Sequence, residues 1–156
     1  ALNAQFALGE VEKPSDLALS LDKQIQHILV DEFQDTSFSQ WRLLEKLTAG
    51  WEEGDGKTLF LVGDPMQSIY RFRKAEVGIF LRAWKNGIHA IRLEPLLLRS
   101  NFRSQAKLVD WVNEFFTALM PGIENIASGA IAFSSSIAAK AAQADGCAKW
   151  YRLFNE

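Results

Sequence analysis

Cysteine is nearly absent from this sequence, because Cys147 is the single one among 156 residues. One thiol cannot close an internal disulfide. The two histidines, His27 and His89, both lie in strand-like contexts, so the sequence offers no cluster of metal ligands of the zinc kind. We therefore expect any metal ion to be bound by oxygen ligands.

Long apolar runs are also missing. No stretch approaches the ~20 apolar residues that a membrane-spanning helix needs, and the first residues do not combine a basic segment with an apolar one. Hydrophobic residues make up 48% and charged residues 23% of the chain, which is the balance of a globular protein. These features predict a cytoplasmic protein without a membrane partner. The net charge of −2 leaves nucleic-acid binding open, because binding depends on where basic residues cluster.

Apolar strands and amphipathic helices alternate along the sequence. Residues 25–30 predict a buried parallel strand, and residues 59–62 predict a second one. Between them, Ser37 can cap a helix whose apolar residues recur at helical spacing. Those residues are Phe38, Trp41, Leu44 and Leu47. Strand, helix and strand in this order indicate parallel strands of a doubly wound α/β sheet.

The alternation is expected to continue through most of the remaining sequence. We predict a helix at 76–84, a strand at 88–93 and a helix at 104–116. Beyond residue 122 the sequence is rich in alanine and serine, and only residues 149–154 predict a further strand.

Polar residues follow both predicted strands at their carboxyl ends, where ligands bind in open parallel sheets. The first strand stops at Asp31 and Glu32. In phosphoryl transfer to water, one carboxylate positions Mg²⁺ and another orients or deprotonates the attacking water. We assign Asp31 to the metal and Glu32 to the water. A solvated turn is the alternative for this pair taken alone.

Three strings of residues together resemble one protein family. Residues 31–37 read DEFQDTS and closely resemble motif II of the UvrD/Rep helicases. Residues 63–75 read GDPMQSIYRFRKA and resemble motif III, and residues 101–104 read NFRS and resemble motif IV. The motifs occur in the family's order over residues 25–116, so the chain is identified as a member. Within the family it is most similar to the exonuclease V beta-subunit (RecB/AddA-like) branch.

The resemblance implies an ATP-dependent 3′–5′ DNA helicase of recombination and repair, with a RecA-like fold, ATP and Mg²⁺ as cofactors and single-stranded DNA as a partner. It also implies nucleotide contacts for three residues. Gln67 would sense the γ-phosphate, Arg103 would act as an arginine finger, and Phe102 would stack on adenine. Packing of Phe102 beneath the following helix is the alternative. Asp35 and Asp64 are predicted to support their loops.

DNA contacts are implied for the string YRFR at residues 70–73. Tyr70, Phe72 and Arg73 alternate rings with charge, which suits base stacking and phosphate binding in a single-strand groove. The alternative is that the rings hold a short helix to the sheet.

One motif of the family has no counterpart in the sequence. The phosphate-binding loop Gly-x-x-x-x-Gly-Lys-Ser/Thr is absent, and residues 50–58 have one intervening residue too many and lead into a strand. We therefore expect a fragment: residues 1–120 as the C-terminal part of a first motor domain lacking the P-loop strand, and residues 121–156 as a linker with a possible first strand of the second. The expected protein partners are the remaining motor and a second exonuclease subunit. The alternative function is a non-catalytic module that binds DNA or a partner subunit without hydrolysing ATP.

Overall fold

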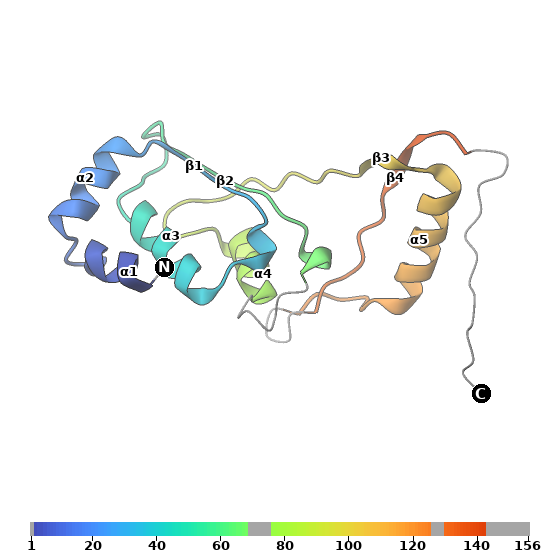
Figure 1. Cartoon of the computed structure of the whole chain (residues 1–156), viewed down its shortest axis with the longest axis horizontal. Helices are drawn as coiled ribbons and strands as arrows, with labels where there is room; N and C mark the ends of the chain where they lie inside the picture. The colour runs from blue at the N-terminus through green and yellow to red at the C-terminus, as the bar shows by residue number, and fades with distance from the viewer. Residues whose placement is uncertain (1, 69–75, 126–129, 143–156) are drawn as a thin grey trace. The chain divides into compact units, whose positions relative to one another are not determined.

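The computed structural model describes residues 2–68, 76–125 and 130–142 (Figure 1). These residues fall into two compact units. The first unit holds residues up to Pro95 together with Asn125 and Ala130, and the second holds Leu96–Glu124 and residues 131–142. Both units mix helices with small parallel sheets, which agrees with the predicted α/β class.

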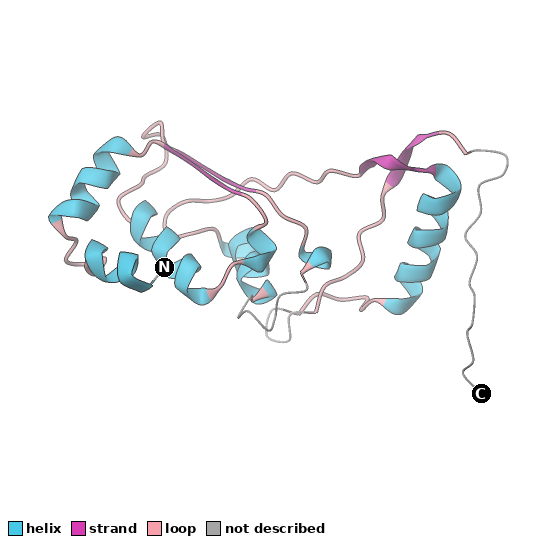
Figure 2. Ribbon diagram, viewed as in Figure 1, coloured by secondary structure: helices cyan, strands magenta, loops and turns pink. Residues whose placement is uncertain are grey.

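The first unit contains a parallel strand pair with a crossover helix (Figure 2). Its elements are α1 (Leu2–Leu8), α2 (Asp16–Gln24), β1 (His27–Val30), η1 (Phe33–Asp35), α3 (Phe38–Thr48), β2 (Thr58–Leu61), η2 (Pro65–Gln67) and α4 (Val77–Asn86). In β1 and β2, His27 lies opposite Thr58 and Val30 lies opposite Leu61. The strands predicted at residues 25–30 and 59–62, and the helices predicted before and after the second of them, are therefore confirmed.

Helix α3 begins where the sequence predicts, because Ser37 and Gln40 cap each other. The Ser37 Oγ accepts a hydrogen bond from the Gln40 backbone N–H at 3.4 Å, and the Gln40 Oε1 accepts one from the Ser37 backbone N–H at 2.9 Å. Trp41 and Leu44 are buried from this helix, whereas Phe38 in the first turn is half exposed. The helix thus fixes the segment between the two strands.

The core of the first unit covers one face of the β1–β2 pair. Its buried members are Phe33, Trp41, Leu44, Ile79, Phe80, Ala83 and Ile88. Ile28 and Val30 of β1 pack against it, while the alternate residue Leu29 is 69% exposed and Phe60 of β2 is 52% exposed. The prediction of a buried strand was thus wrong for one face, because the core helices cover only the other.

The predicted strand at residues 88–93 is a tight turn instead. Gly87 has a left-handed φ of 73°, which ends α4. Ile88 and Ile91 then exchange two backbone hydrogen bonds of 3.0 and 2.9 Å, so the apolar residues bond to each other rather than to a neighbouring strand.

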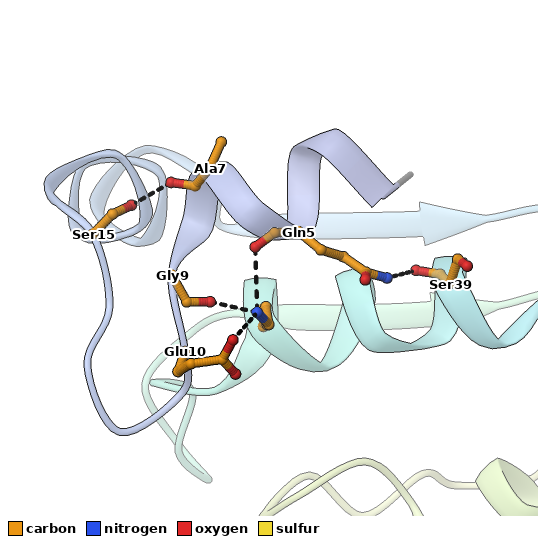
Figure 3. A network of polar contacts seen from close by, with 7 residues as sticks. Gln5, Ala7, Gly9, Glu10, Ser15 and Ser39 are labelled. Carbon is orange, nitrogen blue, oxygen red and sulfur yellow. Dashed lines mark hydrogen bonds and ion pairs between the residues drawn. The ribbon is translucent and has the colours of Figure 1, made fainter.

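A network of polar contacts joins α1 to α3 (Figure 3). The Lys46 Nζ donates hydrogen bonds to the carbonyl oxygens of Gln5, at 3.2 Å, and of Gly9, and it forms an ion pair with Glu10 at 3.5 Å. The Gln5 amide donates to the carbonyl oxygen of Ser39. Lys46 thus supplies a partner for the carbonyl group of Gln5 in the last turn of α1 and for that of Gly9, the residue after the helix.

The second unit pairs β3 (Ser100–Gln105) with β4 (Ile137–Lys140) in parallel, and α5 (Ala106–Leu119) follows β3 directly. The Asn113 amide bonds both backbone groups of Ser136, at 2.8 and 3.1 Å, which ties α5 to the segment before β4. The helix predicted near residues 104–116 is confirmed, beginning after β3. The predicted strand at 149–154 lies outside the described residues. None of the helices placed in the structure is long and apolar enough to cross a membrane.

Candidate functional site

Asp31 and Glu32 lie at the carboxyl end of β1, and both are exposed. The Asp31 Oδ1 accepts a hydrogen bond from the Glu32 backbone N–H at 2.9 Å. Glu32 has φ 51° and ψ 40°, a left-handed conformation that residues other than glycine rarely adopt. The Phe33 backbone N–H then donates to the carbonyl oxygen of Val62 at 2.9 Å. The sharp turn at Glu32 thus brings the chain after β1 against the chain after β2.

Gln34 connects the loops that follow the two strands. Its side chain is 2% exposed, so both ends of the amide require partners within the protein. The Nε2 donates to the Glu32 Oε2 at 2.5 Å, and the Oε1 accepts from the Asp64 backbone N–H at 3.0 Å. No role was predicted for Gln34 from the sequence. The sequence signal that could have identified this role is the single amide side chain among the acidic residues Asp31, Glu32 and Asp35.

Asp64 organises the loop after β2. Its Oδ1 accepts from the Met66 backbone N–H at 3.0 Å, and its Oδ2 accepts from the Gln67 Nε2 at 2.7 Å. In the loop after β1, the Asp35 Oδ1 accepts from the Ser68 Oγ at 3.2 Å. The loop-supporting roles predicted for Asp35 and Asp64 are confirmed.

A continuous chain of hydrogen bonds therefore runs from Glu32 through Gln34 and Asp64 to Gln67. It joins two of the residues that the sequence singled out, and Asp31 is adjacent to its first member. Among the residues that the structure describes, no three His, Cys, Asp or Glu side chains gather into a ready-made metal site. The site thus offers exposed carboxylates at one end of a sheet and an exposed amide beside them.

Gly63 permits the close contact between the two loops. A Cβ at this position would collide with the Gln34 Oε1 and would lie 3.1 Å from both the Phe33 backbone nitrogen and the Phe80 Cε2. Glycine is the residue that allows another group to approach the backbone this closely.

A groove of about 430 Å³ lies beside the carboxylates. Its lining includes the carboxylates of Asp31, Glu32 and Asp35 together with apolar residues of β1 and α3. None of the described residues that line it carries a positive charge. A phosphate bound in this groove would therefore meet no cationic side chain among the described lining residues.

The segment at residues 50–57 forms a loop, as predicted, and Thr58 begins β2. Its Lys57 Nζ bonds the Asp22 Oδ1 at 2.7 Å and lies 5.5 Å from the centre of the Trp51 ring. Hydrogen bonds from the backbone N–H groups of Glu52 and Lys57 hold the pKa of Asp55 below its usual value. Gly54 and Gly56 have φ values of 85° and 81° and turn the chain into β2. The lysine is thus engaged in contacts that hold the loop to α2.

Arg103 and Phe102 lie on β3 in the second unit, and both are exposed. The Asn101 Oδ1 accepts from the backbone N–H groups of Arg103 and Ser104 at 3.0 and 2.9 Å, which fixes the local turn. Phe102 is 71% exposed, so the alternative in which its ring packs beneath α5 is wrong. Its stacking on a base stays a prediction. Tyr70, Phe72 and Arg73 lie outside the described residues.

Comparison with known families matches residues 5–87 to the UvrD/REP helicase N-terminal domain. The chain is 39% identical over 118 residues to the exonuclease/helicase subunit RexA of Lactococcus lactis subsp. cremoris (strain MG1363), covering 75% of this chain and 9% of that protein. It is 40% identical over 117 residues to an ATP-dependent helicase/nuclease subunit of Lysinibacillus sphaericus (strain C3-41), covering 72% of this chain and 9% of that protein. The corresponding helicase/nuclease protein of Streptococcus mutans serotype c (strain ATCC 700610 / UA159) is 37% identical over 118 residues, with 75% and 9% covered. The chain thus spans about a tenth of the length of these curated relatives.

Proposed function

The chain belongs to the UvrD/REP helicase N-terminal domain family, and on that premise we propose that it carries the ATP-hydrolysis and DNA-coupling motifs of an ATP-dependent DNA helicase acting in recombination and repair. The observation that carries the proposal is the hydrogen-bonded chain from Glu32 to Gln67 at the carboxyl ends of β1 and β2. It links a carboxylate and an amide, two of the groups proposed to act in the reaction, through one set of hydrogen bonds. The helicase/nuclease relatives favour the exonuclease V beta-subunit (RecB/AddA-like) branch.

Asp31 is proposed to hold Mg²⁺ and Glu32 to orient the attacking water. The residues fit the ion, because both carboxylates are exposed at a strand end, and Mg²⁺ keeps several waters while taking only one or two protein carboxylates. When bound, the ion neutralises phosphate charge. The Glu32 carboxylate accepts a proton of the water, and Gln34 holds that carboxylate in place.

Gln67 is proposed to hydrogen-bond the γ-phosphate of ATP. Its amide is exposed and donates to the Asp64 Oδ2 at 2.7 Å. Turning towards a ligand breaks this bond, but the bond from the Met66 N–H to the Asp64 Oδ1 still holds the loop. Arg103 is proposed to stabilise the charge of the transferring phosphoryl group, and Phe102 to stack on adenine. The exposure of both side chains supports these roles.

Single-stranded DNA is the proposed polymer substrate, with translocation in the 3′–5′ direction and with Tyr70, Phe72 and Arg73 as its contacts. Residues 1–120 are proposed to belong to the C-terminal part of a first RecA-like motor domain. Residues 121–156 are proposed to lead towards a second motor domain. The proposed partners are the rest of the motor and a second exonuclease subunit.

A second candidate function is a module that binds DNA or a partner subunit without hydrolysing ATP. The observation favouring it is that Lys57, in the segment most similar to a phosphate-binding loop, is engaged by Asp22. ATP hydrolysis by the complete protein distinguishes the two functions.

The test is Glu32→Gln in the complete protein. We expect kcat for ATP to fall by ~10²–10⁴, the usual contribution of a general base, while nucleotide affinity is retained because Asp31 remains. The control is Glu53→Gln, which removes one exposed carboxylate from the loop before β2 and should leave kcat unchanged. Steady-state hydrolysis is measured with and without single-stranded DNA. An unchanged kcat in Glu32→Gln would contradict the proposal.

A further inference from the structure

We propose that Gln34 is a positioning residue that holds the Glu32 carboxylate in its working orientation and fixes it relative to the loop bearing Gln67. The inference rests on the proposed function, since the orientation of Glu32 matters only if that carboxylate acts on water. We call the Gln34 side chain and its hydrogen bonds to Glu32 and Asp64 the bridge, because they link the loops after β1 and β2.

The chemistry at the two ends of the amide permits one orientation. The Nε2, at 2.5 Å from the Glu32 Oε2, meets a group that can only accept when ionised, and the Oε1, at 3.0 Å from the Asp64 nitrogen, meets a group that can only donate. If the amide were flipped, its oxygen would face the Glu32 carboxylate and its NH₂ group would face the Asp64 backbone N–H, so neither hydrogen bond could form. The bridge is therefore specific for a side chain with one donor end and one acceptor end.

Without the hydrogen bond from Gln34, little in the described structure would restrict the orientation of the Glu32 side chain. Its side chain is exposed, so rotation about its bonds is opposed by little packing, and its left-handed backbone is confined to a narrow region. A hydrogen bond to an ionised carboxylate is stronger than one between neutral groups. Because Gln34 is buried, this bond anchors the carboxylate to the rigid core around Phe33.

The other end of the bridge fixes the loop after β2. The Asp64 backbone N–H is bonded by Gln34, while the Asp64 side chain bonds Gln67. The same buried amide therefore sets the distance between the carboxylate and the amide proposed to act on the γ-phosphate. Gly63 leaves the space that the Gln34 Oε1 occupies, so the two residues form one device.

Two substitutions separate the ends of the bridge in the complete protein. Gln34→Met keeps a similar volume and removes both hydrogen bonds. Gln34→Glu keeps an acceptor for the Asp64 N–H but replaces the donor by a second carboxylate facing Glu32. We expect both to lower kcat by about 10²-fold, the effect of a misplacement of about 1 Å, with KM for ATP changed by less than about threefold.

The matched control is Gln5→Met. It removes another buried amide, which donates to the carbonyl oxygen of Ser39 on α3, and it leaves the bonds of Gln34 in place. It should lower the melting temperature without changing kcat. An equal loss of kcat in Gln5→Met and Gln34→Met would overturn the proposal, because general loosening of the first unit would then explain both.

A double-mutant cycle decides whether Gln34 acts through Glu32. If it does, Gln34→Met or Gln34→Glu lowers kcat much less in the Glu32→Gln background than in the unsubstituted protein, and any remaining loss reports the effect of the bridge on the Gln67 loop. Losses that multiply in full overturn the proposal. If only one of the two Gln34 variants folds, that variant is sufficient for the double-mutant cycle. The outcome is also distinguishable from failure of the proposed function: full activity of Glu32→Gln refutes that function, whereas an inactive Glu32→Gln with an active Gln34→Met refutes the bridge alone.

Discussion

Glu32 has an unusual, left-handed backbone conformation, and it is the residue proposed to accept a proton from the attacking water. A left-handed residue other than glycine costs of order 1–3 kcal/mol and persists only where its surroundings hold it. Here the hydrogen bonds of Asp31 to its N–H and of Gln34 to its carboxylate supply that support. Strain of this kind concentrates at functional sites, so the observed conformation supports the role proposed for Glu32.

Arg103 is the predicted catalytic residue whose chemistry is most sharply testable. We expect Arg103→Ala in the complete protein to lower kcat for ATP by ~10³ or more, because arginine fingers contribute about 10³–10⁵ in rate. Arg103→Lys should recover little, since a lysine is a point charge and lacks the planar fork of a guanidinium. The measurement is steady-state phosphate release in the presence of single-stranded DNA.

Arg82→Ala is the control for Arg103→Ala. Arg82 is an exposed arginine of α4, so its removal changes the net charge equally and should leave kcat unaltered. A loss of only a few fold in Arg103→Ala would identify a structural arginine instead.

Local signals in the sequence were sufficient to predict the central elements. The apolar strands, the cap at Ser37 and the spacing of Trp41 and Leu44 predicted β1, α3 and β2, and all three are present. Strand β3 could not be predicted this way, because SNFRSQ is polar and its partner β4 lies more than 30 residues away. The strand expected near Ile88 failed because a glycine-ended helix and a tight turn use the same apolar residues.

The candidate site was predictable to the same extent. Asp31 and Glu32 could be predicted from the sequence, because ligands bind at the carboxyl ends of parallel strands and these two residues follow an apolar strand directly. The role of Gln34 does not, because its acceptor end meets the backbone of Asp64, 30 residues further along the chain. The exposure of Leu29 and Phe60 was not predicted either, because continuous apolar runs are typical of strands buried on both faces, whereas the described core lies against only one face of the β1–β2 pair.

The docking of α1 on α3 depends on Lys46. We expect Lys46→Met to reduce the protection of α1 amides from hydrogen exchange by about 5- to 30-fold, which corresponds to the ~1–2 kcal/mol expected for hydrogen bonds from a charged donor to helix-end carbonyls. Hydrogen exchange in the complete protein, resolved for peptides covering residues 2–8, measures this.

Glu10→Gln separates the carbonyl contacts of Lys46 from its ion pair. Glu10 is exposed and its oxygen lies 3.5 Å from the Lys46 Nζ, so the pair should contribute less than about 0.5 kcal/mol. Exchange in α1 should then stay close to that of the unsubstituted protein. An effect as large as that of Lys46→Met would assign the docking to the ion pair instead of the carbonyl groups.

The 156-residue chain as a whole holds Asp31, Glu32, Gln67 and Arg103 but contains no Gly-x-x-x-x-Gly-Lys-Ser/Thr string. In motors of this kind such a loop holds the β- and γ-phosphates through its amides and lysine, and its Ser/Thr helps to bind Mg²⁺. Lys57 cannot substitute without leaving Asp22, and the described residues lining the groove beside the carboxylates include no cation. Nucleotide affinity should therefore require a phosphate-binding loop from outside these 156 residues.

We accordingly expect the purified 156-residue chain to bind Mg-ATP very weakly and to show no DNA-stimulated hydrolysis. Calorimetry with a non-hydrolysable ATP analogue tests binding, and a phosphate-release assay with and without single-stranded DNA tests turnover, with the complete protein as the active reference. Without the loop the remaining groups face water, whose high dielectric weakens the stabilisation of transition-state charge by Arg103. Micromolar binding would contradict this expectation. The variant Lys57→Met would then show whether residues 50–58 bind the nucleotide. If this variant no longer binds the ATP analogue, Lys57 must leave Asp22 and contact a phosphate when the nucleotide binds.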